Sequence, residues 1–258
     1  RDVKLSFEPL LGKPATHLLA SFSVGGDAGM SLEAVARLLG KNDLEVRDVV
    51  EQLSAAGVLD VFRENKIVVH PFRLRQALVR DVFLKHPVVD LTRYLSEAPD
   101  YAAATRVLIE AKLMGGILPD EILRERLRQL AKTHEDSAFE EYAHLGPNET
   151  EWILDNYPNK LKAVASAAVD TCPDKALGLL LDAAAETYDE RSSQGWQVRA
   201  EDVMPEIKRW VLSAKPDDDA ASERRKLLSI SLEKWFALNK HASVSLRAAA
   251  LVLSIKHE

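Results

Sequence analysis

The stretch Ile67-Val68-Val69-His70-Pro71-Phe72 separates two parts of the chain that differ in the spacing of their apolar residues. Before it, helical spacing gives way to short runs rich in β-branched residues. After it, the apolar positions follow a helical period as far as Glu258. We therefore expect a small mixed domain over residues 1–86 and an α-helical domain over residues 87–258.

The small domain has the element order of a winged helix. Apolar residues at helical spacing predict three helices, over residues 16–24, 31–39 and 43–56. Two β-rich runs joined by a turn then predict a hairpin, over residues 58–62 and 66–70. A fourth helix is expected from Pro71, because proline favours the first position of a helix. Three helices followed by a β-hairpin predict a winged-helix domain.

Many winged helices bind DNA, but the charge of the helix that would enter the groove disfavours this function. Residues 42–56 contain one basic side chain, Arg47, and four carboxylates, Asp43, Glu45, Asp48 and Glu51. Carboxylates that face DNA oppose the attraction to phosphate on which affinity depends. On the fourth helix, Arg73 and Arg80 are the candidate contacts to nucleic acid or a partner. We interpret them first as part of a solvated face that also includes Gln76.

Composition and charge indicate a cytoplasmic protein. The 258 residues include a single cysteine, Cys172, which cannot form an internal disulfide, so a reducing compartment is expected. The net charge of −6 disfavours general binding to nucleic acid. No apolar run approaches the roughly 18 residues that cross a bilayer, so no membrane association is expected. The chain begins at Arg1 rather than at methionine, which suggests a segment of a longer protein.

Proline followed by Asp or Asn recurs along the helical domain. These steps lie at residues 99–100, 119–120, 147–148, 158–159, 173–174 and 216–217. Proline ends a preceding helix because it lacks a backbone donor, and Asp or Asn can then cap the next helix. Each step is therefore predicted to mark a boundary between two helices.

Short connections and Ala-rich apolar stripes predict an α-helical repeat array, either an open α-solenoid or a compact bundle. A solenoid would offer a concave surface to a protein or peptide ligand. Trp196 lies in a polar loop and is a candidate partner contact, because Trp is enriched at binding hot spots. Packing between helices is the competing interpretation of this side chain.

The sequence contains no complete catalytic motif. The glycine-rich run over residues 25–29 lacks the Gly-Lys-Ser/Thr ending of a phosphate-binding loop. The seven histidines lack the spacing of a zinc-binding helix. We therefore assign no catalytic residue, no metal ligand and no cofactor to this chain, and we do not expect it to be an enzyme by itself.

Two motifs point to a family. Leu5-Ser6-Phe7-Glu8-Pro9-Leu10, followed by residues 18–24, resembles the opening of the winged-helix domain in STAND-type signal-transduction ATPases. Val69-His70-Pro71-Phe72-Arg73-Leu74-Arg75 resembles the motif that closes the same domain, although Val69 replaces a methionine and Pro71 an aspartate. The resemblance covers residues 5–84.

The resemblance implies a role for His70. In that family an NTPase domain precedes the winged helix and a repeat array follows it. The motif histidine contacts the β-phosphate of ADP in the resting state, a role that falls on His70 here. ADP or ATP would then bind the full-length parent protein. The competing interpretation is that His70 only caps local backbone.

We therefore expect a non-catalytic regulatory and sensor segment of a STAND-type ATPase. Its winged helix would be a moving arm, and its helical array a protein- or ligand-recognition surface. The alternative is a DNA-binding transcription regulator with a winged helix and a helical ligand-sensing domain. A scaffold subunit with helical repeats and a winged helix ranks third, because such subunits have the opposite domain order.

Overall fold

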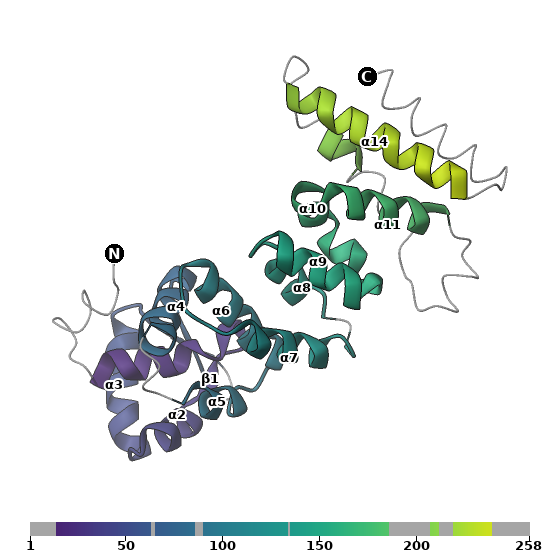
Figure 1. The fold of residues 1–258 in the computed structure, drawn as a ribbon. Helices are drawn as coiled ribbons and strands as arrows, with labels where there is room; N and C mark the ends of the chain where they lie inside the picture. Colours follow the sequence, from purple (N-terminus) through teal and green to yellow (C-terminus); the bar gives the residue numbers. More distant parts are fainter. Residues whose placement is uncertain are drawn as a thin grey trace. The chain divides into compact units, whose positions relative to one another are not determined.

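The computed structural model describes residues 14–62, 65–85, 90–133, 135–185, 207–211 and 219–238. The fold is mainly helical with a small three-stranded antiparallel sheet (Figure 1). The chain divides into two compact units, Arg1–Glu141 and Tyr142–Glu258, with the boundary inside helix α8 (Ser137–Ala143). The domain boundary predicted after residue 86 lies within the first unit, and it stays a prediction.

The first described element of this unit is a helix over residues 14–23. The following elements are η1 (Gly26–Ala28), β1 (Met30–Ser31), α2 (Leu32–Leu39), α3 (Asp43–Ala55), β2 (Leu59–Val61) and β3 (Lys66–Val69). The strands are ordered β1-β3-β2, with Met30 opposite Ile67 and Asp60 opposite Val68. The helices and hairpin strands predicted here are therefore confirmed. Strand β1 was not predicted, because two residues are too short to show an alternating pattern.

Local signals in the sequence set the helix ends in this region. The Ser31 hydroxyl accepts a hydrogen bond from the Ala34 amide at 3.1 Å and caps α2. The side chain of Asn42 caps α3 in the same way through the Leu44 amide, at 3.0 Å. Gly40 ends α2 with φ of 62°, a left-handed conformation that glycine adopts without strain.

Helix α6 (Tyr101–Leu113) is the centre of the first unit. It packs against α4 (Phe72–Val79), the π-helical turn η3 (Arg80–Leu84), η1 and α7 (Asp120–Leu130). Ala102, Ala103 and Ala104 are buried and allow close approach by the neighbouring elements. A side chain at Gly26 would lie 2.8 Å from the carbonyl oxygen of Ala103, so η1 requires glycine there. Helix α5 (Leu91–Ser96) precedes α6.

The second unit contains α9 (Pro147–Asn156), η4 (Pro158–Lys160), α10 (Leu161–Thr171), α11 (Pro173–Ala185) and α14 (Asp219–Leu238). Helix α10 packs against both α9 and α11, and α11 packs against α14 (Figure 1). The side chains at these contacts are apolar and many are small, as the apolar stripes in the sequence predicted. The buried residues include Val164, Ala165, Ala168, Leu177 and Leu180.

Five of the six Pro-Asp/Asn steps lie in the described residues, and each lies at a helix start, as predicted. Asp100 caps α6 by accepting from the Ala103 amide at 2.9 Å. Capping is the wrong mechanism for α7, α9 and η4, none of which has a side-chain cap. In α9, Pro147 itself is the first helical residue. Proline fits this position because its missing N–H has no partner there in any case. The step at residues 216–217 lies outside the described residues.

None of the helices in the described part of the chain is both long enough and apolar enough to cross a bilayer. Trp196 lies outside the described residues.

Candidate functional site

His70 lies directly after β3, where its backbone amide donates to the carbonyl of Val58 at 2.8 Å. Its imidazole is 45% exposed, and its Nε2 lies 3.1 Å from Oδ2 of Asp60 on β2. The His70–Pro71 peptide bond is cis, and α4 begins at Phe72, one residue later than predicted. The Asp60 carboxylate therefore lies beside one of the two ring nitrogens of His70.

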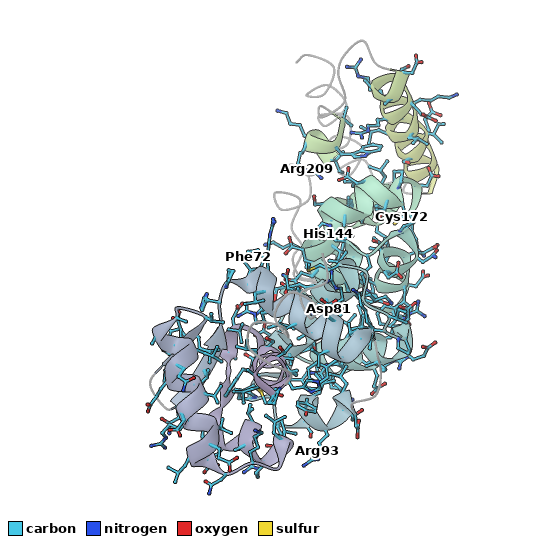
Figure 2. All side chains as sticks on the ribbon, turned by 90° about the vertical axis from the view of Figure 1, so that its left-hand side faces the viewer. Phe72, Asp81, Arg93, His144, Cys172 and Arg209 are labelled. Atoms are coloured by element: carbon cyan, nitrogen blue, oxygen red, sulfur yellow. The ribbon has the colours of Figure 1, made fainter. Side chains whose placement is uncertain are left out.

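The two arginines predicted as contacts have different surroundings. Arg73 is exposed, and its guanidinium lies 6.0 Å from the ring centre of Phe72, which is also exposed (Figure 2). Arg80 is largely buried and donates from Nη1 to the carbonyl of Met114 at 3.3 Å. Gln76 is buried, so the expectation of a solvated face is wrong for Gln76 and Arg80. Their roles in binding stay predictions.

Asp81 carries a buried negative charge in the η3 turn (Figure 2). Its side chain is 0% exposed and is held by two cations. Nε of Arg80 lies 2.7 Å from Oδ1, and Nζ of Lys85 lies 2.9 Å from the same oxygen. These contacts compensate the cost of removing the carboxylate from water. We interpret this cluster as structural.

A second charged cluster joins η1 to α4 and α6. The buried guanidinium of Arg75 donates to the Gly26 carbonyl at 3.2 Å and to the carboxylate of Asp27. Nη2 of Arg106 on α6 lies 3.9 Å from Asp27, which is mostly exposed. The charges in this cluster are paired and join three elements of the fold, so we interpret the cluster as structural.

Glu141 is a carboxylate with an incomplete set of partners. Its Oε2 is buried and has no hydrogen-bond partner in the described part of the chain. Burial and the nearby carboxylate of Glu110 raise the pKa of Glu141 to about 7, against the lowering effect of Arg106. Glu141 is therefore a group whose protonation affects stability near neutral pH.

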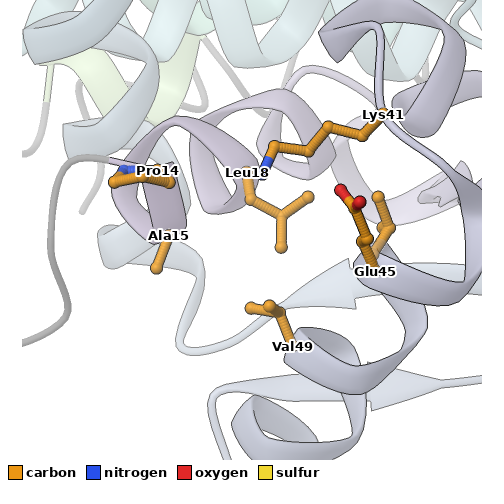
Figure 3. A pocket seen from close by; sticks show the side chains of 7 residues that line it. Pro14, Ala15, Leu18, Lys41, Glu45 and Val49 are labelled. Carbon is orange, nitrogen blue, oxygen red and sulfur yellow. The ribbon is translucent and has the colours of Figure 1, made fainter.

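One crevice between the first helix and α3 is too small for a ligand. It has a volume of about 30 Å³, which is room for a single water molecule. Leu18 and Val49 line it, and the side chains of Lys41 and Glu45 extend over it (Figure 3). We assign no function to this crevice.

A larger groove lies between α5, the start of α6 and α7. Its volume is about 600 Å³, within the range of small-molecule and short-peptide sites. Apolar and polar side chains both contribute to its lining: Thr92, Leu95, Ser96, Ala98, Tyr101, Glu121, Ile122, Glu125 and Arg126. Leu95 and Arg126 are buried, whereas Tyr101 and Ile122 are about 40% exposed.

Arg126 places a buried positive charge at this groove. Its Nε donates to the Thr105 hydroxyl at 2.8 Å, and its Nη2 donates to the Tyr101 carbonyl at 3.1 Å. The ring of Tyr101 stacks on the guanidinium, with 3.8 Å between Cζ and the ring centre. No carboxylate pairs with Arg126 among the described residues. Burial lowers the pKa of Arg126, which nevertheless stays charged at neutral pH.

No protein-family model, curated protein or solved structure matches the chain. The candidate sites therefore depend on the geometry alone. The groove was not predicted from the sequence, because its lining comes from three separate segments. The Asp60–His70 pair did have a signal, since the hairpin predicted over residues 58–62 and 66–70 places these two positions diagonally across the paired strands.

Proposed function

We propose that residues 14–85 form a winged helix that serves as the moving arm of a STAND-type signalling ATPase. The observation that carries this proposal is the order of elements, in which a β-hairpin follows three helices and pairs with a short strand β1. The segment itself is regulatory and non-catalytic. Hydrolysis would belong to an NTPase domain N-terminal to it, which would hold ADP or ATP.

His70 would contact the nucleotide phosphate in this arrangement. Its exposed position at the end of β3 supports the role. The Asp60 carboxylate would weaken this contact, because it would repel a phosphate at the same ring. Nε2 faces Asp60, so Nδ1 is the nitrogen that would donate to a phosphate. Movement of the arm would then break the contact and release the resting state.

The test uses the parent protein, including the region before Arg1. His70→Ala should reduce the ADP that remains bound after purification about tenfold, the usual effect of one hydrogen bond to a charged group. Asp60→Asn should increase ADP retention, because it removes a neighbouring negative charge. Arg47→Ala, which removes an exposed cation on α3 outside the motif, is the control. Equal ADP retention in the wild type and His70→Ala would end the proposal for His70.

We also propose that the helical region over residues 87–258 recognises a protein or peptide ligand in the cytoplasm. The successive packing of α10, α11 and α14 supports an array of stacked helices in the second unit. Whether these helices form an open solenoid or a closed bundle decides how much surface they offer. Small-angle X-ray scattering distinguishes the two arrangements by the radius of gyration of the second unit.

The DNA-binding alternative ranks lower because of α3. Asp43, Glu45, Asp48 and Glu51 are all exposed on this helix, where they would oppose contact with phosphate. A salt titration of DNA binding tests the alternative. Salt-sensitive binding that is lost in Arg73→Ala would favour the transcription regulator over the signalling arm.

A further inference from the structure

The groove between α5, α6 and α7 combines an apolar wall with a buried cation. Ile122 and Leu95 provide apolar surface, and Ile122 is 40% exposed although it lines a concave site. Such a combination is typical of ligand sites, where apolar contacts give affinity and a few polar groups fix orientation. The groove therefore fits a ligand that has an apolar part and a polar part close together.

The charge of Arg126 determines the polar part of the ligand. Its protein partners are a hydroxyl, a carbonyl and an aromatic ring, and none of them carries a negative charge. Removing a cation from water without a counter-ion is unfavourable, and an anion in the groove would relieve this cost. A carboxylate suits a guanidinium because it can accept two parallel hydrogen bonds.

The rim of the groove limits the number of negative charges on the ligand. Glu121 and Glu125 both line the site and are exposed. Glu125 is held by Arg128 at 2.8 Å and by Gln129 at 3.1 Å, and these hydrogen bonds lower its pKa. Two carboxylates at the rim would repel a strongly acidic ligand. A ligand with one carboxylate and otherwise neutral or basic groups matches this pattern.

We propose that this groove binds the C-terminal carboxylate of a peptide whose last side chain is apolar. A terminal residue has its carboxylate and its side chain on one Cα, so a short site can contact both. The carboxylate pairs with Arg126, and the apolar side chain packs against Leu95 and Ile122. The rest of the peptide leaves past Glu121 and Glu125, where basic residues are favoured.

The inference is tested by NMR titration of the ¹⁵N-labelled chain. The probe is a pool of acetylated tetrapeptides that end in leucine with a free carboxylate, with neutral and basic residues at the other positions. The Nε–H signal of Arg126 and the backbone amides of α5 and α7 should shift and saturate below about 1 mM peptide. The same pool with an amidated C-terminus should bind at least tenfold more weakly.

Two exposed isoleucines offer a matched pair of variants. Ile122→Ser, within the groove, should weaken binding of the free-acid pool about fivefold through lost apolar contact. Ile117→Ser, at a residue that is 76% exposed and outside the groove, should leave binding unchanged. Arg126→Met should abolish the preference for the free acid over the amide.

Several results would overturn the assignment. They are a lack of saturable shifts with the free-acid pool, equal binding of acid and amide, and equal weakening by the two isoleucine variants. Tighter binding of amidated peptides with an internal glutamate would assign the groove to acidic side chains instead. This inference rests on the recognition role proposed above and specifies its ligand. If the groove does not bind these peptides, ADP retention by the parent protein is still expected to depend on His70. The peptide titration and the ADP measurement therefore test the groove and the nucleotide role separately.

Discussion

The η3 turn and the α5–α7 groove both bury a charge, but they treat it differently. Asp81 in η3 has two cations within 2.9 Å, Arg80 and Lys85. Arg126 at the groove has only uncharged partners in the described residues. A buried charge that is paired with counter-ions contributes to the stability of the fold, whereas a buried charge without them can still bind an external ion. The same helical framework therefore holds one charge for stability and leaves another for a ligand.

Removal of the Asp81 carboxylate should have the largest effect. Asp81→Ala removes the buried carboxylate that contacts both the largely buried Arg80 and Lys85. Loss of one partner from a buried ion pair costs about 3–5 kcal/mol, because the remaining charge is uncompensated. Urea unfolding followed by circular dichroism measures this loss. Asp48→Ala, at an exposed position on α3, is the control and should change stability by less than about 0.5 kcal/mol.

Glu141 is a third case beside Asp81 and Arg126. It is a partly buried carboxylate, and one of its oxygens has no hydrogen-bond partner in the described residues. Its pKa is raised from 4.5 to about 7, so between these pH values the folded chain binds more protons than the unfolded chain. Stability from this group is therefore highest below pH 4.5 and falls as the pH rises to about 7. Since solvent screens a partly exposed group, we expect a loss of about 1–2 kcal/mol.

The measurement is urea unfolding of the wild type and Glu141→Gln at a series of pH values. The variant cannot ionise at this position, so the difference in unfolding free energy should change with pH in favour of the variant. A difference that stays constant from pH 4.5 to pH 7 would contradict the raised pKa.

Replacement of Arg126 by an apolar side chain of similar length should change stability much less than Asp81→Ala. Arg126→Met loses two hydrogen bonds but also removes an unpaired buried charge, and the two effects oppose each other. We expect a net change within about 1 kcal/mol, measured by the same unfolding experiment. A loss of 3 kcal/mol or more would mean that the guanidinium is structural, like Asp81.

The exposed pair of Arg37 and Glu97 should have the smallest effect. Their side chains are joined at 2.7 Å, and Arg37 is 67% exposed. Surface pairs contribute little because water screens them and the side chains lose freedom. Arg37→Ala should reduce the unfolding free energy by less than about 0.5 kcal/mol. A loss above 1 kcal/mol would show that exposure is not what separates the strong pairs from the weak ones.

The features set by local sequence could be predicted. The hairpin, the capping of α2 by Ser31 and the helix starts at Pro-Asp/Asn steps all depend on residues within a few positions of each other. Asp81 and Lys85 also have the spacing of a helical ion pair. What the sequence did not indicate is that this pair is buried, because burial depends on the position of α6.

Features that join distant segments could not be predicted. Arg75 pairs with Asp27 across 48 positions, and Arg126 reaches Thr105 across 21. Neither separation follows a period of helix or strand. The groove has the same origin, since side chains from the three separate segments α5, α6 and α7 line it together. Its unpaired arginine became visible only when the carboxylates around it could be located.

The packing of α6 has a consequence for the smallest piece of this protein that can fold by itself. A fragment that ends at residue 86 would contain α4 and η3 but would lack the helix that covers them. Buried apolar side chains of α4 and η3, which include Leu78 and Phe83, would then be more exposed to water. Such a fragment should self-associate or be degraded, whereas one extended to residue 141 keeps its own apolar interior.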